Sequence, residues 1–314
     1  MAEKAKSKTA SSLYLPGLNG IRAIASIAVL IAHLNHELVA HNANYILDME
    51  MGRYAVSIFF TLSGFLITYL LLLEKQKTGT ISIKKFYIRR ILRIWPLYFA
   101  FLAVALLVGS SLGMEFMLPG LLLTVFFAPN IALMNGESPA FTQHYWSLGV
   151  EEQFYLFWPW LIRQSKNAGL AIGVFLIGFY LLKFGLRFGA GGFSFSYTLI
   201  HLARFDCMAM GGLAAWLMWK GIPKKIKDVL YHPVTQTISW LFIIAILLEF
   251  VKLFTFVEHQ AIALLSAIII LNVASNPNPV VSLEGKTWAF FGDISFGLYV
   301  WHPLLIMNIG NVIF

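Results

Sequence analysis

The chain has 314 residues, of which 59% are hydrophobic and only 12% are charged, and its mean hydropathy is +0.74. Soluble domains carry about 25% charged residues, so this composition excludes a soluble globule and indicates a polytopic membrane protein. The net charge of +8 is better explained by basic loops at a cytoplasmic membrane face than by nucleic-acid binding.

The N-terminal residues 1–12, MAEKAKSKTASS, are a short basic tail that we expect in the cytoplasm. No small-residue cleavage site follows a short apolar core, so we expect no removable signal peptide. Residues 13–314 show no repeat, low-complexity tract or separate soluble domain, and we expect one membrane domain there. The only cysteine, Cys207, lies in an apolar segment, so the chain has no disulfide framework.

The predicted fold is an all-α, polytopic transmembrane helical bundle. About ten apolar segments are long enough for a membrane helix of roughly 20 residues, and we expect about ten membrane helices. The segments lie near 18–38, 54–73, 93–112, 115–133, 145–163, 168–187, 197–219, 236–254, 258–274 and 287–312.

The positive residues conflict with a simple count of these segments. Lys and Arg cluster over 75–93, after the second segment, and again over 220–227, after the seventh. Both loops should be cytoplasmic, like the N-terminus. Seven full spans between the N-terminus and the second loop would instead place that loop on the opposite side of the membrane. We expect segment 115–133 to be re-entrant, because prolines interrupt it, which leaves nine or ten full spans.

The first apolar segment carries two ionisable residues, Arg22 and His33. Eleven steps at about 100° per residue place both on one helix face, some 16 Å apart along the axis at about 1.5 Å per residue. Asn19 and Ser26 share that face. Ionisable groups inside a membrane are costly, so this stripe is a candidate functional site.

The second segment contains Ser63 and Gly64, small residues that most often serve close helix packing in membranes. The basic stretch after it places Arg89, Arg90 and Arg93 within one helical turn of each other. Arginine presents a fork of donors that suits phosphate groups. Contact with anionic membrane lipid is the alternative, and spacing alone slightly favours it.

A later aromatic segment, QHYWSLGVEEQFYLFWPW, holds the adjacent carboxylates Glu151 and Glu152. At least one should face a cavity, an arginine or a histidine, whereas an aromatic belt at the water boundary is the alternative. Trp146 precedes them at an interfacial position. Further on, we expect Glu258 and His259 in a loop.

These residues leave two classes of function open. A histidine can act as general base on a hydroxyl, and a basic cluster can hold a phosphorylated donor such as a coenzyme A thioester, which together would permit acyl transfer. A proton- or ion-coupled transporter using His33, Arg22 and Glu151 is the other class. No metal-ligand signature, phosphate-binding glycine loop or nucleophile elbow is visible in the sequence.

Five ordered blocks resemble the acyltransferase-3 family of bacterial integral-membrane O-acyltransferases. They are LPGLNGIRAIASIAVLIAHL, VSIFFTLSGFLI, ISIKKFYIRRILRIWPLY, YWSLGVEEQFYLFWP and ISFGLYVWHP. The family hallmark is an arginine and a histidine separated by ten residues, which Arg22 and His33 match. The resemblance covers nearly the whole chain.

The resemblance implies O-acyl transfer, commonly from acetyl-CoA used at the cytoplasmic side, with no bound cofactor. The acceptor would be an envelope polysaccharide or glycolipid, and the enzyme would lie in the bacterial cytoplasmic membrane among lipids. It assigns catalysis to His33 and Glu151, donor binding to Arg22, Arg89, Arg90 and Arg93, and supporting roles to Asn19, Ser63, Trp146 and Glu152.

One position departs from the family pattern. Family members usually carry Asp where this chain has Asn19. An amide keeps the hydrogen-bonding capacity of the position but removes its charge. Asn19 therefore cannot replace the family aspartate in any role that depends on its negative charge.

Overall fold

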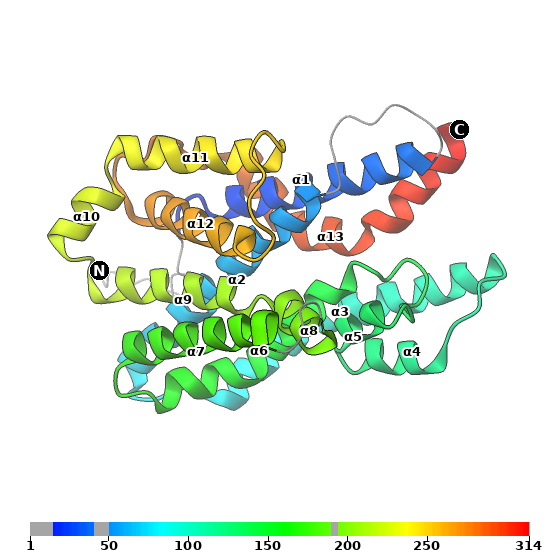
Figure 1. The fold of residues 1–314 in the computed structure, drawn as a ribbon, viewed down its shortest axis with the longest axis horizontal. Coiled ribbons are helices and arrows are strands. Elements are labelled where there is room, and N and C mark those ends of the chain that lie inside the picture. The colour runs from blue at the N-terminus through cyan, green and yellow to red at the C-terminus, as the bar shows by residue number, and fades with distance from the viewer. Residues whose placement is uncertain (1–14, 41–49, 190–193, 314) are drawn as a thin grey trace, which may run out of the picture.

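A computed structural model describes residues 15–40, 50–189 and 194–313 of the chain. Within these ranges the protein is built from helices and contains no strand, as the sequence predicts (Figure 1). The expected basic tail, residues 1–12, lies outside the described residues. The helices are α1 (Leu18–Ala40), α2 (Glu50–Thr78), α3 (Ile83–Ser111), α4 (Leu118–Val125), α5 (Pro129–Met134), α6 (Tyr145–Gln164), α7 (Ala168–Gly189), α8 (Phe195–Ala203), α9 (Phe205–Lys220), α10 (Lys224–Leu230), α11 (Pro233–Leu247), α12 (Glu258–Ser275) and α13 (Lys286–Ile313).

Six of these helices are long and apolar enough to cross a membrane, namely α1, α2, α3, α7, α12 and α13. A seventh span results if α10 and α11, which meet at a bend of 50°, are taken together. The protein is therefore a multi-pass membrane protein, but the expectation of about ten spans is not confirmed.

Two of the expected spans are broken into shorter helices. Segment 115–133 forms α4 and α5, of 8 and 6 residues, as expected for a stretch that is not a full span. Segment 197–219 is interrupted at Arg204, which has a left-handed backbone with φ of 44° between α8 and α9. Non-glycine residues pay a steric cost in this conformation, and the helix breaks there.

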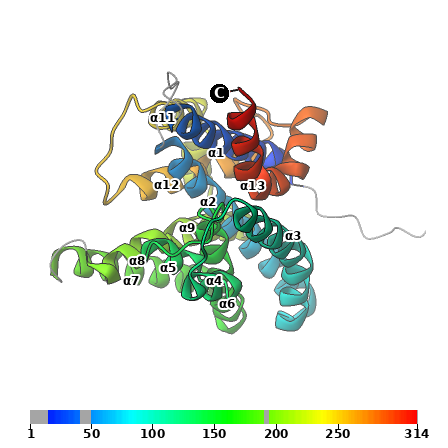
Figure 2. The same ribbon diagram turned by 90° about the vertical axis from the view of Figure 1, so that its right-hand side faces the viewer.

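The long helix α2 lies at the centre of the bundle. Figures 1 and 2 show α1, α11, α12 and α13 on one side and α3 to α8 on the other, with α2 and α9 between them. Of the described helices, α2 packs most extensively against α9 and also contacts α1, α6 and α12. Residues of α2 belong to both buried hydrophobic clusters of the protein.

The contact between α2 and α9 brings backbone against backbone. A Cβ added to Gly64 would lie 2.7 Å from Cα of Met208 and nearer still to its carbonyl oxygen. A Cβ added to Gly211 of α9 would likewise meet the Thr61 carbonyl. Small residues permit such close approach in membrane bundles, so the packing role predicted for Gly64 is confirmed.

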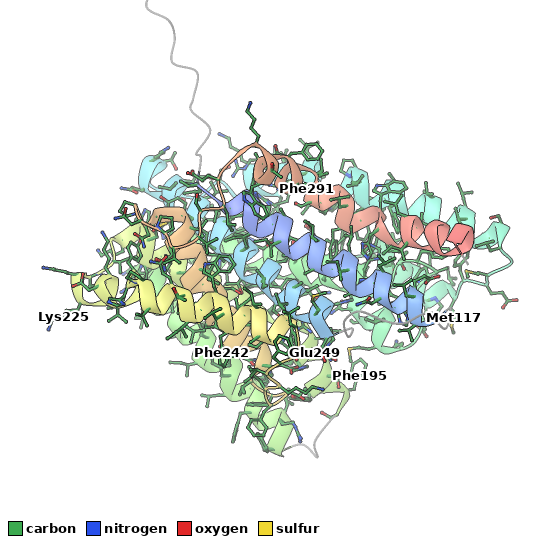
Figure 3. The ribbon with its side chains drawn as sticks, turned by 90° about the horizontal axis from the view of Figure 1, so that it is seen from above. Met117, Phe195, Lys225, Phe242, Glu249 and Phe291 are labelled. Atoms are coloured by element: carbon green, nitrogen blue, oxygen red, sulfur yellow. The ribbon has the colours of Figure 1, made fainter. Side chains whose placement is uncertain are left out.

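The outside of the bundle is strongly apolar. Met117, Phe195 and Phe242 project from it in Figure 3, and their exposed fractions are 56%, 55% and 40%. Exposed leucines and phenylalanines continue along α7 and α11. A surface of this kind is stable against lipid hydrocarbon but not against water, in agreement with the membrane location.

Candidate functional site

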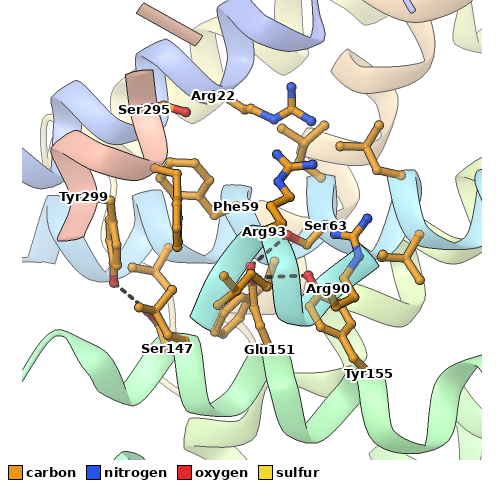
Figure 4. A pocket seen from close by; sticks show the side chains of 18 of the residues that line it. Arg22, Phe59, Ser63, Arg90, Arg93, Ser147, Glu151, Tyr155, Ser295 and Tyr299 are labelled. Atoms are coloured by element: carbon orange, nitrogen blue, oxygen red, sulfur yellow. Dashed lines mark hydrogen bonds between the residues drawn. The ribbon is translucent and has the colours of Figure 1, made fainter. Parts of the chain in front are cut away.

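A pocket of about 150 Å³ opens between α1, α2, α3, α6 and α13 (Figure 4). Its lining combines an apolar wall with a group of charged and hydroxyl side chains. The polar members are Arg22, Ser63, Arg90, Arg93, Ser147, Glu151, Tyr155, Ser295 and Tyr299. The pocket therefore joins residues from both ends of the sequence.

Three arginines form one wall of this pocket. Arg22 comes from the first turns of α1, and Arg90 and Arg93 from the first turns of α3. Figure 4 shows their guanidinium groups directed toward the same space. The Arg90 guanidinium carbon lies 5.8 Å from the centre of the Tyr155 ring and 5.9 Å from that of Phe86, which holds the side chain by cation–π attraction.

The carboxylate of Glu151 lies opposite the arginines and accepts two hydrogen bonds. Ser63 Oγ donates to Oε1 at 2.7 Å, and the Tyr155 hydroxyl donates to Oε2 at 3.0 Å. Ser63 comes from α2, whereas Tyr155 lies one turn after Glu151 on α6. Both carboxylate oxygens are thus fixed by neutral donors, and the nearby guanidiniums stay available to an anionic ligand.

The Arg22 side chain is held in place by a hydrogen bond to a residue at the surface of the bundle. Asn19 Oδ1 accepts from the Arg22 guanidinium, and Asn19 Nδ2 donates to Asp293 Oδ1 on α13 at 3.0 Å. The amide at position 19 therefore bridges a cation on α1 and a carboxylate on α13. A negative charge is thus present at this place, on Asp293 of α13 and not on residue 19.

His33 lies on the same helix as Arg22 but does not line the pocket. Its Nδ1 lies 3.0 Å from the Val29 carbonyl oxygen, and its ring centre lies 4.6 Å from that of His302 on α13. A carbonyl can only accept, so a neutral His33 carries its proton on Nδ1 and keeps a lone pair on Nε2. That tautomer is the one required of a general base acting through Nε2.

Two further histidine rings, those of His302 and His144, form a series of contacts with His33 inside the bundle. The His302 ring centre lies 5.0 Å from that of His144, and both side chains are buried. The Tyr299 hydroxyl donates to the His144 carbonyl at 3.1 Å and lies 2.5 Å from Ser147 Oγ. Because Tyr299 and Ser147 line the pocket, this chain of contacts connects the pocket to His33.

Five predicted site residues do not line the pocket, namely His33 and Asn19, described above, and three others. Arg89 points to the other side of α3, where it pairs with Glu74 at 3.1 Å with its side chain 53% exposed. Glu152 faces Trp95, whose indole Nε1 lies 3.5 Å from Oε2. Trp146 packs below the Arg204 guanidinium, 5.0 Å from its ring centre. Among the described residues, the structure therefore gathers Arg22, Arg90, Arg93, Ser63 and Glu151, but not these five.

Four pocket residues were not predicted from the sequence, namely Ser147, Tyr155, Ser295 and Tyr299. Helical spacing offered a signal for two of them, since Ser147 and Tyr155 each lie four residues from Glu151 and share its helix face. The α13 residues had no such signal, because their contact with α6 and α2 depends on the tertiary arrangement.

The family model described as "Acyltransferase domain" matches residues 15–314. Among curated proteins, the peptidoglycan O-acetyltransferase OatA of Listeria monocytogenes is 28% identical over 337 residues, covering 95% of this chain and 50% of that protein. The O-acetyltransferase OatA of Staphylococcus aureus is 26% identical, covering 97% of this chain and 52% of that protein.

The chain spans about half the length of the curated relatives that it matches. No solved structure matches the chain significantly. The match of the family model covers nearly every residue, including all nine polar residues of the pocket. The chain therefore belongs to the acyltransferase family that its five sequence blocks predicted.

Proposed function

We propose that this protein transfers an acyl group, acetyl in the first instance, from acyl-CoA to a hydroxyl of a cell-envelope glycan or glycolipid. The observation that carries the proposal is the pocket in which Arg22, Arg90 and Arg93 face a fixed carboxylate, Glu151. The names of the relatives, which include peptidoglycan O-acetyltransferase, support acetyl as the group and a glycan as the acceptor.

The arginine wall is suited to the phosphate groups of the donor. Guanidinium groups bind phosphate oxygens through paired, charge-assisted hydrogen bonds, and Arg22, Arg90 and Arg93 bond neither to Glu151 nor to each other. Arg93 is exposed at the pocket rim, whereas Arg22 and Arg90 are half-buried. A donor that enters from this rim would place its phosphates on the arginines and its thioester toward Glu151 and Ser147.

His33 acts as the base in this proposal, taking the proton of the acceptor hydroxyl on Nε2 or transiently accepting the acyl group. In the direct route the hydroxyl oxygen attacks the thioester carbonyl, the carbon–sulfur bond breaks, and coenzyme A leaves as the thiolate. The proton on His33 then passes to the thiolate. Glu151 has a positioning role, because it holds Ser63 and Tyr155 at the wall of the pocket.

The location forms part of the same proposal. Residues 13–314 would act as one membrane domain in the bacterial cytoplasmic membrane, with the N-terminus and the basic residues 84–93 on the cytoplasmic side. Arg90 and Arg93 would then meet a cytoplasmic donor. His33, some 16 Å further along α1 at about 1.5 Å per residue, would lie nearer to an acceptor on the other side.

The proposal is tested by the release of free coenzyme A from acetyl-CoA by the purified protein with envelope glycan as acceptor. His33→Ala should abolish release. Arg90→Gln and Arg93→Gln should raise the KM for the donor, whereas the control Arg89→Gln should not, because Arg89 pairs with Glu74 outside the pocket. Equal donor kinetics in all three arginine variants would remove the pocket from donor binding.

The acceptor and the acyl group are identified together by mass spectrometry of envelope glycans from cells with and without the protein. A glycan that gains the mass of an acetyl group only when the protein is present supports the proposal. Ion or solute movement in liposomes without consumption of acyl-CoA would instead favour a transporter.

A further inference from the structure

A second polar cluster lies where α8, α12 and α2 meet, away from the pocket. It contains His201 in the last turn of α8 and Glu258 and His259 in the first turn of α12. The sequence placed Glu258 and His259 in a loop, but the structure places them in a helix with exposed fractions of only 5% and 0%. Two imidazoles and a carboxylate are thus enclosed by protein.

The potential ligand atoms of the three residues converge. One atom from each residue lies within 4.8 Å of the other two, and His259 Nε2 is 3.5 Å from Glu258 Oε1. These two atoms and both ring nitrogens of His201 are buried and accept or donate no hydrogen bond among the described residues. Buried polar atoms are rarely left in this state, so their convergence points to a missing partner.

Neighbouring groups hold the cluster from outside. Ser57 Oγ lies 3.0 Å from His259 Nδ1, and the Tyr54 hydroxyl donates to Glu258 Oε2 at 3.2 Å. These contacts leave His259 Nε2 and Glu258 Oε1 pointing inward. Metal-ligating histidines and carboxylates are held by hydrogen bonds of this kind, through the atom that does not bind the metal.

The nearby cations make their hydrogen bonds outside the cluster. Arg53 pairs with Glu50 at 2.6 Å and forms only a longer ion pair with Glu258, whose Oε1 lies 4.0 Å from Arg53 Nη2. Arg204 donates to the Arg53 carbonyl and to Ser57 Oγ, and Lys183 donates to the Phe256 carbonyl. No cation therefore completes the hydrogen bonding of the cluster.

We propose that His201, Glu258 and His259 bind a divalent transition metal of the zinc type that joins α8 to α12. Two histidines and one glutamate are a known set of zinc ligands, which leaves a fourth position open. Tetrahedral coordination with bonds of 2.0–2.1 Å sets the ligand atoms about 3.3 Å apart, close to the 3.5 Å between His259 Nε2 and Glu258 Oε1. The remaining adjustment falls on His201, whose helix ends at the left-handed residue Arg204.

The test measures Zn²⁺ in full-length protein purified through a tag that contains no histidine. After incubation with Zn²⁺ and gel filtration, elemental analysis should give about one zinc per chain. His201→Ala, His259→Ala and Glu258→Gln should each remove this zinc, whereas the control His232→Ala should retain it, because His232 is exposed at the start of α11. Ser57→Ala should weaken zinc affinity by roughly 10- to 100-fold, as loss of a supporting hydrogen bond does.

Two readouts separate binding from folding. X-ray absorption of the bound zinc should show nitrogen and oxygen ligands at 2.0–2.2 Å and no sulfur. Zn²⁺, but not Mg²⁺, should raise the unfolding temperature of the wild type, and Glu258→Gln should lose that increase while its melting without metal stays cooperative. Absence of zinc in the wild type, or equal zinc in wild type and the three ligand variants, would overturn the proposal.

Discussion

The close contact between α2 and α9 predicts a large effect from one added methyl group, in Gly64→Ala. The new Cβ would lie 2.7 Å from Cα of Met208 and nearer to its carbonyl oxygen, whereas carbon atoms in contact are normally about 3.5–4.0 Å apart. Both sides of the contact are backbone, so no rotamer change can relieve it. The two helices must therefore separate by about 1 Å.

Overpacking of this kind costs about 1–3 kcal/mol, and we expect the upper end, ~3 kcal/mol, because the backbone cannot adapt. At roughly 2–4 °C per kcal/mol for a large domain, the unfolding temperature should fall by ~6–12 °C. The native thiol of Cys207 supplies the assay, because it is buried next to Met208. A fluorogenic maleimide reacts with this thiol only as the bundle opens.

A matched control is Gly178→Ala on α7, where an added Cβ meets no atom within 4 Å. This variant should melt at or slightly above the wild-type temperature, because alanine favours a helix by up to about 1 kcal/mol over glycine. If Gly64→Ala and Gly178→Ala melt together, the backbone contact between α2 and α9 does not hold the bundle as described.

Three further outcomes follow from the site. Glu151→Gln should lower kcat for coenzyme A release by about tenfold or more, which corresponds to a loss of ~1.4 kcal/mol of transition-state stabilisation. The donor KM should change little, because Glu151 contacts Ser63 and Tyr155 and not the arginines. An unaltered kcat contradicts the positioning role. Asn19→Asp alone should impair activity, because it sets two carboxylates against each other at the 3.0 Å contact with Asp293, and Asn19→Asp combined with Asp293→Asn should restore it; a double variant no better than the single one refutes the bridge to Arg22. His302→Ala should reduce kcat, because it removes the ring beside His33. The variant should melt at the wild-type temperature, so that the lower kcat is not caused by unfolding. A kcat equal to that of the wild type would show that this contact does not position the base.

Local patterns in the sequence predicted the parts of the site that lie within single helices. The spacing of Arg90 and Arg93 placed both on one side of α3, and the depth of Glu151 and Glu152 indicated that at least one of them faces a cavity, an arginine or a histidine. The same spacing grouped Arg89 with them, yet the structure turns it toward Glu74, because the rotation of α3 about its axis is set by packing against α6 and α13.

The number of spans was harder to predict for a physical reason. Hydropathy measures whether a segment tolerates lipid, but α4, α5 and α8 are apolar and still too short to cross a membrane. Their ends depend on local backbone geometry, such as the left-handed residues Phe127 and Arg204. The convergence of His201 with Glu258 and His259 likewise depends on a contact between helices that are more than 50 residues apart.

Helix α13 contributes residues both to the pocket and to the contact with His33. Ser295 and Tyr299 face the pocket, and His302, less than one turn later, touches His33. A rigid helix cannot turn one of these residues without turning the others, since each residue is separated from the next by about 100° and 1.5 Å. Because Ser295 and Tyr299 share this helix with His302, a displacement of α13 at the pocket wall would also change the surroundings of His33.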